Sequence, residues 1–426
     1  MIRLVLCCAA ALPLAAASAD TFVLRGATVH PVTSPPIENA ILYVKDGRIA
    51  GLGAKLAAPK GVRLVEAKGL HVYPGIIDSA TQIGLSEIGA VRESVDTNEI
   101  GNFNPQLKAL SAVNPASEHI AVTRANGITA ALTMPGGGII GGQAALIHLE
   151  GWTWEEMAVR PSAALVLRYP VLESGTARAS TRTPALPLAE RRRNLEKQLA
   201  ELRQFFEQAR RYQKAKQAQA AGFRTDLKME AMLPVLEGKL PVLVFAAREK
   251  AIREAIQFAE REKIRMILAD PRQAVPVAGE LKAKNIPVIL GPTMAAPLEE
   301  DDPYDRVATT PAELHKAGVK FAFGTFATSS SRNLPYQAAN AVAYGLPYEE
   351  ALKALTINPA EIWGVAAEYG SIEIGKWADL MVTDGDPLEV RTQVRQLYIK
   401  GKPVDLDNRH KRLYERYSSR PSSNAR

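Results

Sequence analysis

The chain has 426 residues, of which 47% are hydrophobic and 23% are charged, a composition that excludes a disordered or fibrous protein. Its formal net charge is +7, and residues 407–426 supply +4 of this total with six basic and two acidic side chains. We expect this tail to be flexible, partly helical and solvated. We expect no nucleic-acid binding, because no aromatic or motif support accompanies the basic residues.

Residues 1–19 have the features of a secretory signal peptide. Arg3 precedes an apolar run, and Ala17-Ser18-Ala19 forms a small-residue cleavage site before Asp20. We therefore predict export across the inner membrane into a bacterial periplasm. A retained membrane anchor is the alternative, but the run is shorter than the about 20 residues that a span needs. Since no later segment is sufficiently apolar, we predict no membrane span in the mature chain, which would also contain no cysteine.

Two segments at opposite ends of the chain read as short strands and turns. Residues 20–70 show strand-like alternation with a hairpin signal at Asp46-Gly47, and residues 367–406 return to the same pattern. The stretch "IKGK" near the end resembles "VKDG" near the start. We predict one composite β-sandwich built from both termini.

Residues 71–366 alternate apolar, β-rich runs with helical patterns. Continuous apolar runs are typical of parallel strands that helices cover. Seven runs are found: "YPGIID", "GITAALTM", "AALVLRY", "LPVLVFAA", "IRMILAD", "IPVILGP" and "VKFAFGT". They predict an α/β fold, a TIM (β/α)8 barrel in which one strand is missed or irregular. A doubly wound open sheet is the alternative, which the missing G-x-G-x-x-G disfavours. Residues 185–222 read as a helical insertion with an amphipathic helix.

The segment 135–146, "PGGGIIGGQAAL", is rich in glycine. It lacks the Gly-Lys-Ser ending of a phosphate loop, so we interpret it as a tight turn with a close backbone approach. Gln143 would then contact a ligand at the barrel mouth. We expect Trp152 and Trp154 to pack beside the barrel.

Several stretches resemble the amidohydrolase superfamily, in particular its exported, imidazolonepropionase-like members. "VYPGIID" resembles the family's lead into a metal motif, "NLPYQAANAVAYGLPYEEALKALTINPAEIWGV" its last barrel helices, and "GSIEIGKWADLMVTDGDP" its return to the small domain. The resemblance implies one or two divalent metals, usually zinc, at the carboxyl end of the barrel. It also implies histidine ligands from strands one, five and six, and an aspartate base on strand eight. The family reaction is hydrolysis of carbon–nitrogen bonds other than peptide bonds, by metal-bound hydroxide.

The positions that should hold this metal have changed. The strand-one motif D-x-H-x-H reads Asp78-Ser79-Ala80-Thr81-Gln82, and the strand-eight motif G-T-D reads Gly324-Thr325-Phe326. Phe245 follows strand five, and Ala269-Asp270 follows strand six, where histidines are expected. None of the six histidines falls on a ligand position. We therefore treat Ala80, Gln82, Phe245, Asp270 and Phe326 as a degenerate metal site and expect no metal cofactor.

Three hypotheses follow, and whether the protein is an enzyme stays open among them. The first is a pseudoenzyme that binds a small molecule at the barrel mouth through Asp78, Gln82, Gln143 and Thr325. It could also act in a homo-oligomer, or in a hetero-oligomer with an intact amidohydrolase. The second is an active hydrolase with displaced metal ligands, which would come from Asp78, Gln82, Asp270 or the acidic loop residues Glu87, Glu93, Asp96 and Glu99. Our own expectation for the four loop residues is that they only solvate their loop. The third is a structural subunit that acts through the long helix and basic tail.

Overall fold

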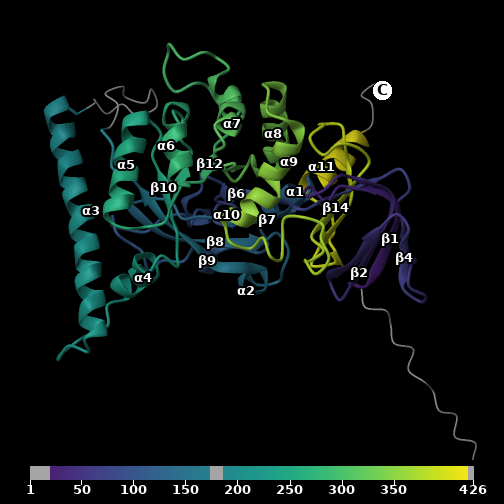
Figure 1. Ribbon diagram of the computed structural model, residues 1–426, viewed down its shortest axis with the longest axis horizontal. Coiled ribbons are helices and arrows are strands. Elements are labelled where there is room, and N and C mark those ends of the chain that lie inside the picture. Colours follow the sequence, from purple (N-terminus) through teal and green to yellow (C-terminus); the bar gives the residue numbers. More distant parts are fainter. Residues whose placement is uncertain (1–19, 173–185, 421–426) are drawn as a thin grey trace, which may run out of the picture.

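The computed structural model describes residues 20–172 and 186–420. The predicted signal peptide, residues 1–19, lies outside the described residues. Two eight-stranded sheets organise the described chain (Figure 1). One forms a barrel with helices on its outside, and the other is a strand-rich domain made from both ends of the chain. The predicted α/β fold with a TIM-like barrel is confirmed.

The barrel sheet runs in chain order around the barrel. Its strands are β6 (Ile76–Thr81), β7 (Ile128–Thr133), β8 (Ile140–His148), β9 (Ala158–Arg168), β10 (Val242–Phe245), β11 (Met266–Ala269), β12 (Val288–Leu290) and β13 (Phe321–Phe323). Neighbours pair in parallel except at β8, which is antiparallel to both β7 and β9. The helices after strand β10 are α5 (Glu249–Arg261), α6 (Ala278–Ala283), α7 (Arg306–Lys316), α8 (Leu334–Ala343), α9 (Tyr348–Leu355) and α10 (Ile357–Ile362).

Strand β8 is the strand that the sequence pattern misses. Residues 140–146 were expected in a tight turn, but only the residues before Ile140 form the turn, and the strand is buried along its whole length. Five glycines around its start hide the apolar pattern. Glycine is required there, because a Cβ on Gly141 would lie 2.6 Å from the Gly136 carbonyl oxygen. An antiparallel hairpin also needs no helical crossover, so no helical pattern marks the connection.

The barrel closes between β6 and β13 through few backbone contacts. The Phe326 amide donates to the Ala80 carbonyl at 2.7 Å, and the Thr325 amide donates to the Asp78 carboxylate at 3.0 Å. Gly324 allows this approach, since a Cβ on it would lie 2.9 Å from the Ala80 nitrogen. We call these contacts between β6 and β13 the seam.

Two apolar clusters lie on the two sides of the barrel sheet. The inner cluster fills the barrel with small and branched side chains, and Trp363, which follows α10, belongs to it. The outer cluster lies between the strands and the helices. Alternation along β9 assigns Ala164 and Val166 to the inner cluster and Leu165 and Leu167 to the outer one, as expected for a strand with period two.

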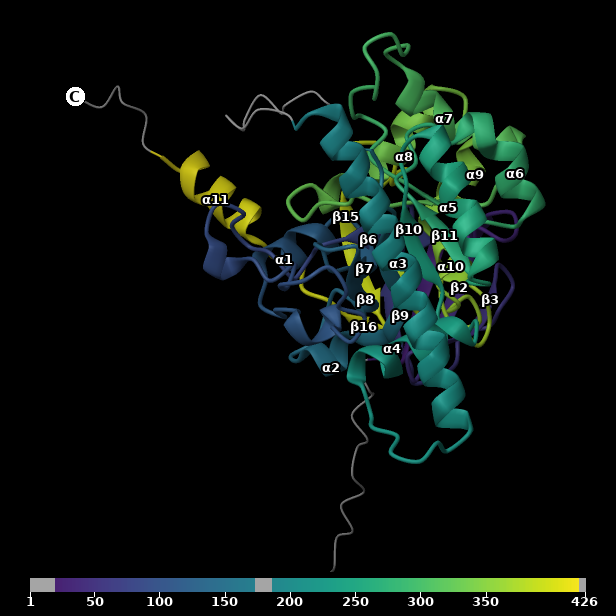
Figure 2. The same cartoon turned by 90° about the vertical axis from the view of Figure 1, so that its left-hand side faces the viewer.

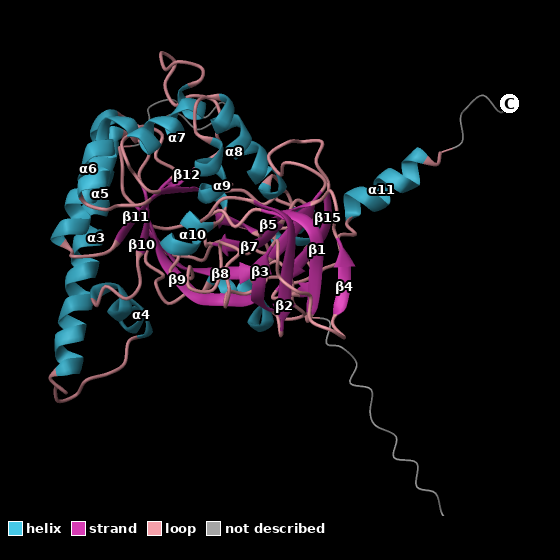
Figure 3. Cartoon of the chain, turned by 45° about the vertical axis from the view of Figure 1, so that its right-hand side comes forward, coloured by secondary structure: helices cyan, strands magenta, loops and turns pink. Residues whose placement is uncertain are grey.

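The second sheet joins strands from both ends of the chain (Figure 3). They are β1 (Phe22–Val29), β2 (Ile37–Lys45), β3 (Arg48–Gly53), β4 (Arg63–Glu66), β5 (His71–Pro74), β14 (Leu380–Thr383), β15 (Val394–Ile399) and β16 (Lys402–Pro403). These strands form one continuous hydrogen-bonded sheet around a core of its own.

The border between the two sheets falls within a stretch that was expected to be one strand. "VYPGIID" divides at Gly75: β5 pairs with β14 in the second sheet, and β6 starts the barrel. Only glycine fits at this border, because any Cβ on Gly75 would overlap the side chain of Thr129. The barrel therefore begins at Ile76 rather than at residue 71.

A buried polar contact connects the barrel to the second sheet. His148, at the end of β8, approaches the carboxylate of Asp379 at 3.0 Å, and both side chains are almost inaccessible to solvent. The other carboxylate oxygen accepts the Lys400 amide at 2.8 Å. We call this contact the junction pair.

The remaining helices lie at the periphery. Helix α3 (Leu188–Gln217) runs along one flank of the barrel with α4 (Leu227–Leu236) beside its lower half, and buries Leu202, Phe205, Phe206 and Ala209 (Figures 1 and 2). Helices α1 (Glu118–Arg124) and α2 (Trp154–Met157) are short. In the basic tail, α11 (Arg409–Ser418) projects from the body, with Arg412 paired to Glu118 and Asp407. Among the described residues, no helix has the length and apolarity that crossing a membrane requires.

Candidate functional site

The carboxyl ends of the parallel barrel strands form the mouth, which is where barrel enzymes place their reacting groups. All the positions singled out by the resemblance lie on β6, β10, β11 and β13 or directly after them.

Asp78 is fully buried at the seam. One carboxylate oxygen accepts the amides of Ala80 at 3.3 Å and Thr325 at 3.0 Å, and the other accepts the Thr325 hydroxyl at 2.6 Å. Burial raises the pKa of Asp78 to about 7, and the hydrogen bonds from Thr325 oppose this rise.

Three hydroxyl groups complete this network. Ser331 and Thr81 donate to the Ala327 carbonyl at 2.6 and 2.8 Å, which leaves the Thr325 hydroxyl to donate to Asp78. Each hydroxyl proton thus has an acceptor, and the carboxylate receives three hydrogen bonds. Asp78 therefore orients the surrounding backbone and hydroxyl groups. Asp78 and Thr325 were also expected to face a ligand, but both are buried and bonded to each other.

Phe245 and Phe326 meet across the mouth. Their ring centroids are 5.7 Å apart with the planes at 80°, and both side chains pack on the inner cluster while staying partly exposed. Phe326 has a φ of +52°, a backbone conformation that is unfavourable for a bulky residue. The expected strand-five ligand and strand-eight base are thus replaced by an edge-to-face aromatic pair.

Arg168 is a mouth residue that the sequence interpretation missed. It ends β9 on the face that carries Ala164 and Val166, and its guanidinium carbon lies 4.5 Å from the centroid of the Phe245 ring. The sequence did contain a signal for Arg168. In "AALVLRY", a charged residue ends an apolar strand, at the end where barrel residues line the mouth.

The other expected residues do not converge on the mouth. Gln143 belongs to the outer face of β8, where it donates to the Pro105 carbonyl at 2.9 Å and accepts from Ser162 at 2.5 Å. The expectation that Gln143 faces a mouth ligand is therefore wrong, because neighbouring Ala144 is the residue in the inner cluster. Gln82 is partly buried with its amide nitrogen beside Gly136.

Asp270 also points away from the mouth. It follows inward-facing Ala269 and contacts Gly291, and it lines a small cavity with α7 residues Val307 and Thr310. Its φ is +44°, and burial raises the pKa of its carboxyl group while Arg272, 3.6 Å away, opposes the rise.

The residues present do not fit the zinc site that the resemblance implies. Ala80 has no donor atom, Phe245 and Phe326 have none in their side chains, and Gln82 offers a neutral amide. Among the described residues, no three His, Cys, Asp or Glu side chains are grouped so as to hold a metal ion. Glu93, Asp96 and Glu99 are exposed on their loop.

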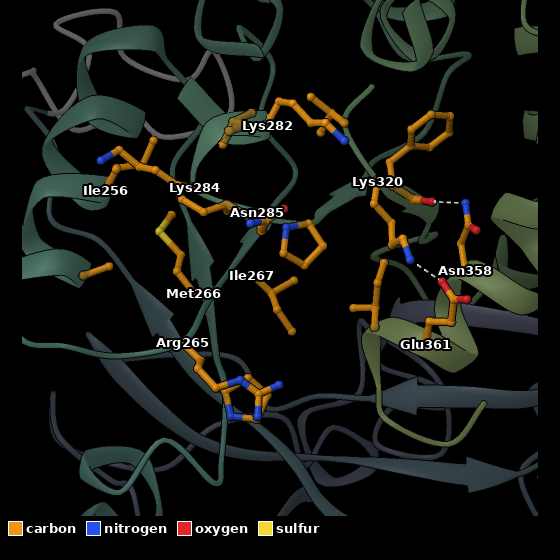
Figure 4. Close-up of a pocket in the computed structure, with 18 of the residues that line it drawn as sticks. Ile256, Arg265, Met266, Ile267, Lys282, Lys284, Asn285, Lys320, Asn358 and Glu361 are labelled. Carbon is orange, nitrogen blue, oxygen red and sulfur yellow. Dashed lines mark hydrogen bonds and ion pairs between the residues drawn. The ribbon is translucent and has the colours of Figure 1, made fainter. Parts of the chain in front are cut away.

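A large cavity lies at the opposite end of the barrel from the mouth. It has a volume of about 970 Å³ and is lined by the amino ends of β11 to β13 and by the surrounding helices (Figure 4). Several basic residues border it, of which Lys320 pairs with Glu361 and Lys284 with Glu260. This end of a barrel serves stability rather than chemistry, so we place the candidate site at the mouth.

Comparisons with known proteins decide the family. A family model described as the amidohydrolase family matches residues 243–404. The crystal structure of an amidohydrolase from Thermotoga maritima MSB8 is similar with a TM-score of 0.79 and 30% identity, covering 90% of this chain and 99% of that one. The chain belongs to the amidohydrolase family.

Two curated relatives match this chain over very different lengths. Amidohydrolase tasK from Hapsidospora irregularis is 26% identical over 87% of this chain, which corresponds to 41% of tasK. An imidazolonepropionase from Sphingopyxis alaskensis is 47% identical over 51 residues, 12% of this chain and 13% of that protein. The chain thus spans about two fifths of tasK. The expected likeness to imidazolonepropionase-like amidohydrolases is confirmed.

Proposed function

We propose that this amidohydrolase-family protein is a pseudoenzyme that binds a small molecule at the barrel mouth. The observation that carries the proposal is the Phe245–Phe326 pair, which occupies the expected places of a metal ligand and of the catalytic base. A benzyl side chain neither coordinates zinc nor accepts a proton. The family reaction needs both, since the metal lowers the pKa of bound water from 15.7 to about 7.

The positions of the other polar groups support this proposal over a hydrolase with displaced ligands. Asp78 is enclosed by three hydrogen-bond donors, and Asp270 contacts the outer side of the barrel. A metal site built from them would need both carboxylates to leave their present partners.

The first test measures zinc and other divalent metals in protein purified without chelator. A zinc-containing adenosine deaminase, such as the one from Xanthomonas campestris whose structure has bound zinc, serves as the positive control. We expect metal far below one atom per chain for this protein. One zinc per chain, lost when Asp78 is replaced by Asn, would contradict the proposal.

The second test measures turnover of cyclic amides and N-acyl amino acids, with and without added zinc, manganese or cobalt. We expect no hydrolysis above the background of a matched preparation of the Asp78→Asn variant. Metal-dependent hydrolysis that this variant lacks would favour an active enzyme with displaced ligands.

We further propose that the protein is exported and acts in an oligomer. The residues that support export are those of the signal-like segment 1–19. Amino-terminal sequencing of periplasmic protein should give a start at Asp20, and light scattering should give a mass above that of one chain. A start at Met1 or a monomer would contradict the respective statement.

A further inference from the structure

Arg168 carries a positive charge into the mouth, and no acidic side chain in the described part of the chain pairs with it. It ends β9 in register with the inward-facing residues Ala164 and Val166, it is partly buried, and burial lowers the pKa of its guanidinium group. Among residues 20–172 and 186–420, the contact that the structure gives its guanidinium is the face of Phe245, 4.5 Å away. Removing a cation from water without a carboxylate or carbonyl partner is costly, and contact with an aromatic ring offsets only part of this cost.

Other partly buried arginines, on the barrel strands or beside them, do have such partners. Arg160, at the other end of β9, donates to the Trp363 carbonyl at 2.7 Å. Arg272 donates to the Ala296 carbonyl at 2.7 Å and lies 3.6 Å from the carboxylate of Asp270. Arg124 pairs with Glu150 and with the Leu149 carbonyl. The unpaired state of Arg168 is therefore specific to the mouth and not a general property of this fold.

The surroundings of Arg168 restrict which anion could pair with its guanidinium group. A guanidinium group offers parallel N–H donors that match the two oxygens of a carboxylate. Phe245 holds one face of the guanidinium, and its edge-to-face contact with Phe326 extends the apolar surface. A single cation balances a monoanion, whereas a phosphate dianion would need a second one.

We propose that Arg168 binds the carboxylate of a small organic monoacid whose apolar part lies on the Phe245–Phe326 pair. The proposal rests on the proposed function in placing a ligand at the mouth, and it adds the chemical class of that ligand. Arg168 is the specificity-determining residue of this site, and Phe245 positions both the guanidinium and the ligand.

The test uses calorimetric titration of the full mature chain with benzoate, phenylacetate and hexanoate. Benzyl alcohol tests the need for charge, and inorganic phosphate tests the need for a carboxylate. We expect at least one acid to bind while the alcohol and phosphate do not. The Arg168→Gln variant should bind that acid about 10- to 100-fold more weakly, the effect of losing a charged hydrogen-bonded pair, with Arg168→Lys in between.

Two variants serve as controls. Arg160→Gln removes a guanidinium from the same strand at the opposite end and should leave binding unchanged. Phe245→Leu keeps apolar volume but removes the ring, and should weaken the aromatic acids more than hexanoate. Without ligand, Arg168→Gln should unfold at the same temperature as the parent or at a higher one, because it removes a partly buried charge that has no acidic partner among the described residues.

The proposal is overturned if none of the three acids binds, if Arg168→Gln binds them as the parent does, or if phosphate competes equally well. These outcomes are independent of the metal and turnover tests. Bound zinc together with Arg168-dependent acid binding would refute the pseudoenzyme and keep this site. If the protein has no bound metal, shows no turnover and binds none of the acids, the loss of catalysis is supported and the Arg168 site is refuted.

Discussion

Asp78 is buried among hydroxyl and amide donors, and the pKa of its carboxyl group is raised to about 7. In the unfolded chain an aspartate has a pKa of about 3.9. Between these two values the folded protein holds a proton that the unfolded chain has lost. The free energy of unfolding therefore falls as the pH rises from about 4 to about 7, and stays at the lower level above that range.

The Asp78→Asn variant should lose this pH dependence. The Asn amide can donate to the Thr325 hydroxyl, which then donates to the Ala327 carbonyl at its present distance of 3.1 Å. From pH 5 to pH 7, the free energy of unfolding of the parent should fall on the order of 2 kcal/mol more than that of the variant. Urea unfolding at several pH values measures this, and parallel curves for the two proteins would contradict it.

At the level of single residues, the sequence could show which side chains had changed but not where the remaining ones point. The loss of ligands at Ala80, Phe245 and Phe326 follows from motif alignment alone. Whether Asp270 and Gln143 face inward depends on strand register, and a shift of one residue reverses the face. For the same reason, the sequence alone could not show that Arg168, at the end of an apolar run, faces into the barrel.

At the level of elements, the barrel depends on a narrow seam between β6 and β13. The shortest strands of the barrel, β12 and β13, have three residues each. Backbone pairing between β6 and β13 is therefore limited, and the hydrogen bond from the Thr325 amide to the Asp78 carboxylate adds to it. Strand β8 shows the limit of reading elements from patterns. Its glycines and antiparallel direction removed both signals that identified the other seven strands.

Gly324→Ala tests the seam. The added methyl group would lie 2.9 Å from the Ala80 nitrogen and 3.0 Å from its Cβ, so the strands must separate. We expect a loss of about 1–3 kcal/mol in the free energy of unfolding. Gly279→Ala in α6 is the matched control, because nothing lies within 4 Å of its new methyl group. That variant should be unchanged or more stable by up to about 1 kcal/mol. Equal effects of both changes would refute the steric argument.

At the level of the whole molecule, the barrel and the second sheet share the junction pair of His148 and Asp379. The border at Gly75 and the return of the chain through β14 bring the two sheets together. The sequence indicated both regions through their different patterns. It could not indicate this pair, whose members lie 231 residues apart.

His148→Leu should weaken the whole protein rather than one sheet. The substitution leaves a buried carboxylate oxygen of Asp379 without its partner, at a cost of about 3 kcal/mol. Adding Asp379→Asn should recover part of this loss, because the amide carries no charge. The more exposed His315 on α7 is the control, and its replacement by Leu should change stability by less than about 0.5 kcal/mol. Chemical denaturation with a double-mutant cycle measures the coupling, and additive effects would contradict it.

The reversed direction of β8 has a practical consequence. Because β8 ends at the face opposite the mouth, its link to β9 also lies there, and Trp152 in this link is 90% exposed rather than packed as expected. Residues 20–426 contain no cysteine. A cysteine placed at position 152 would be the single thiol of that chain, so the protein could be tethered to a sensor surface or a dye from behind. The mouth would then face the solution, ready for screening of candidate ligands.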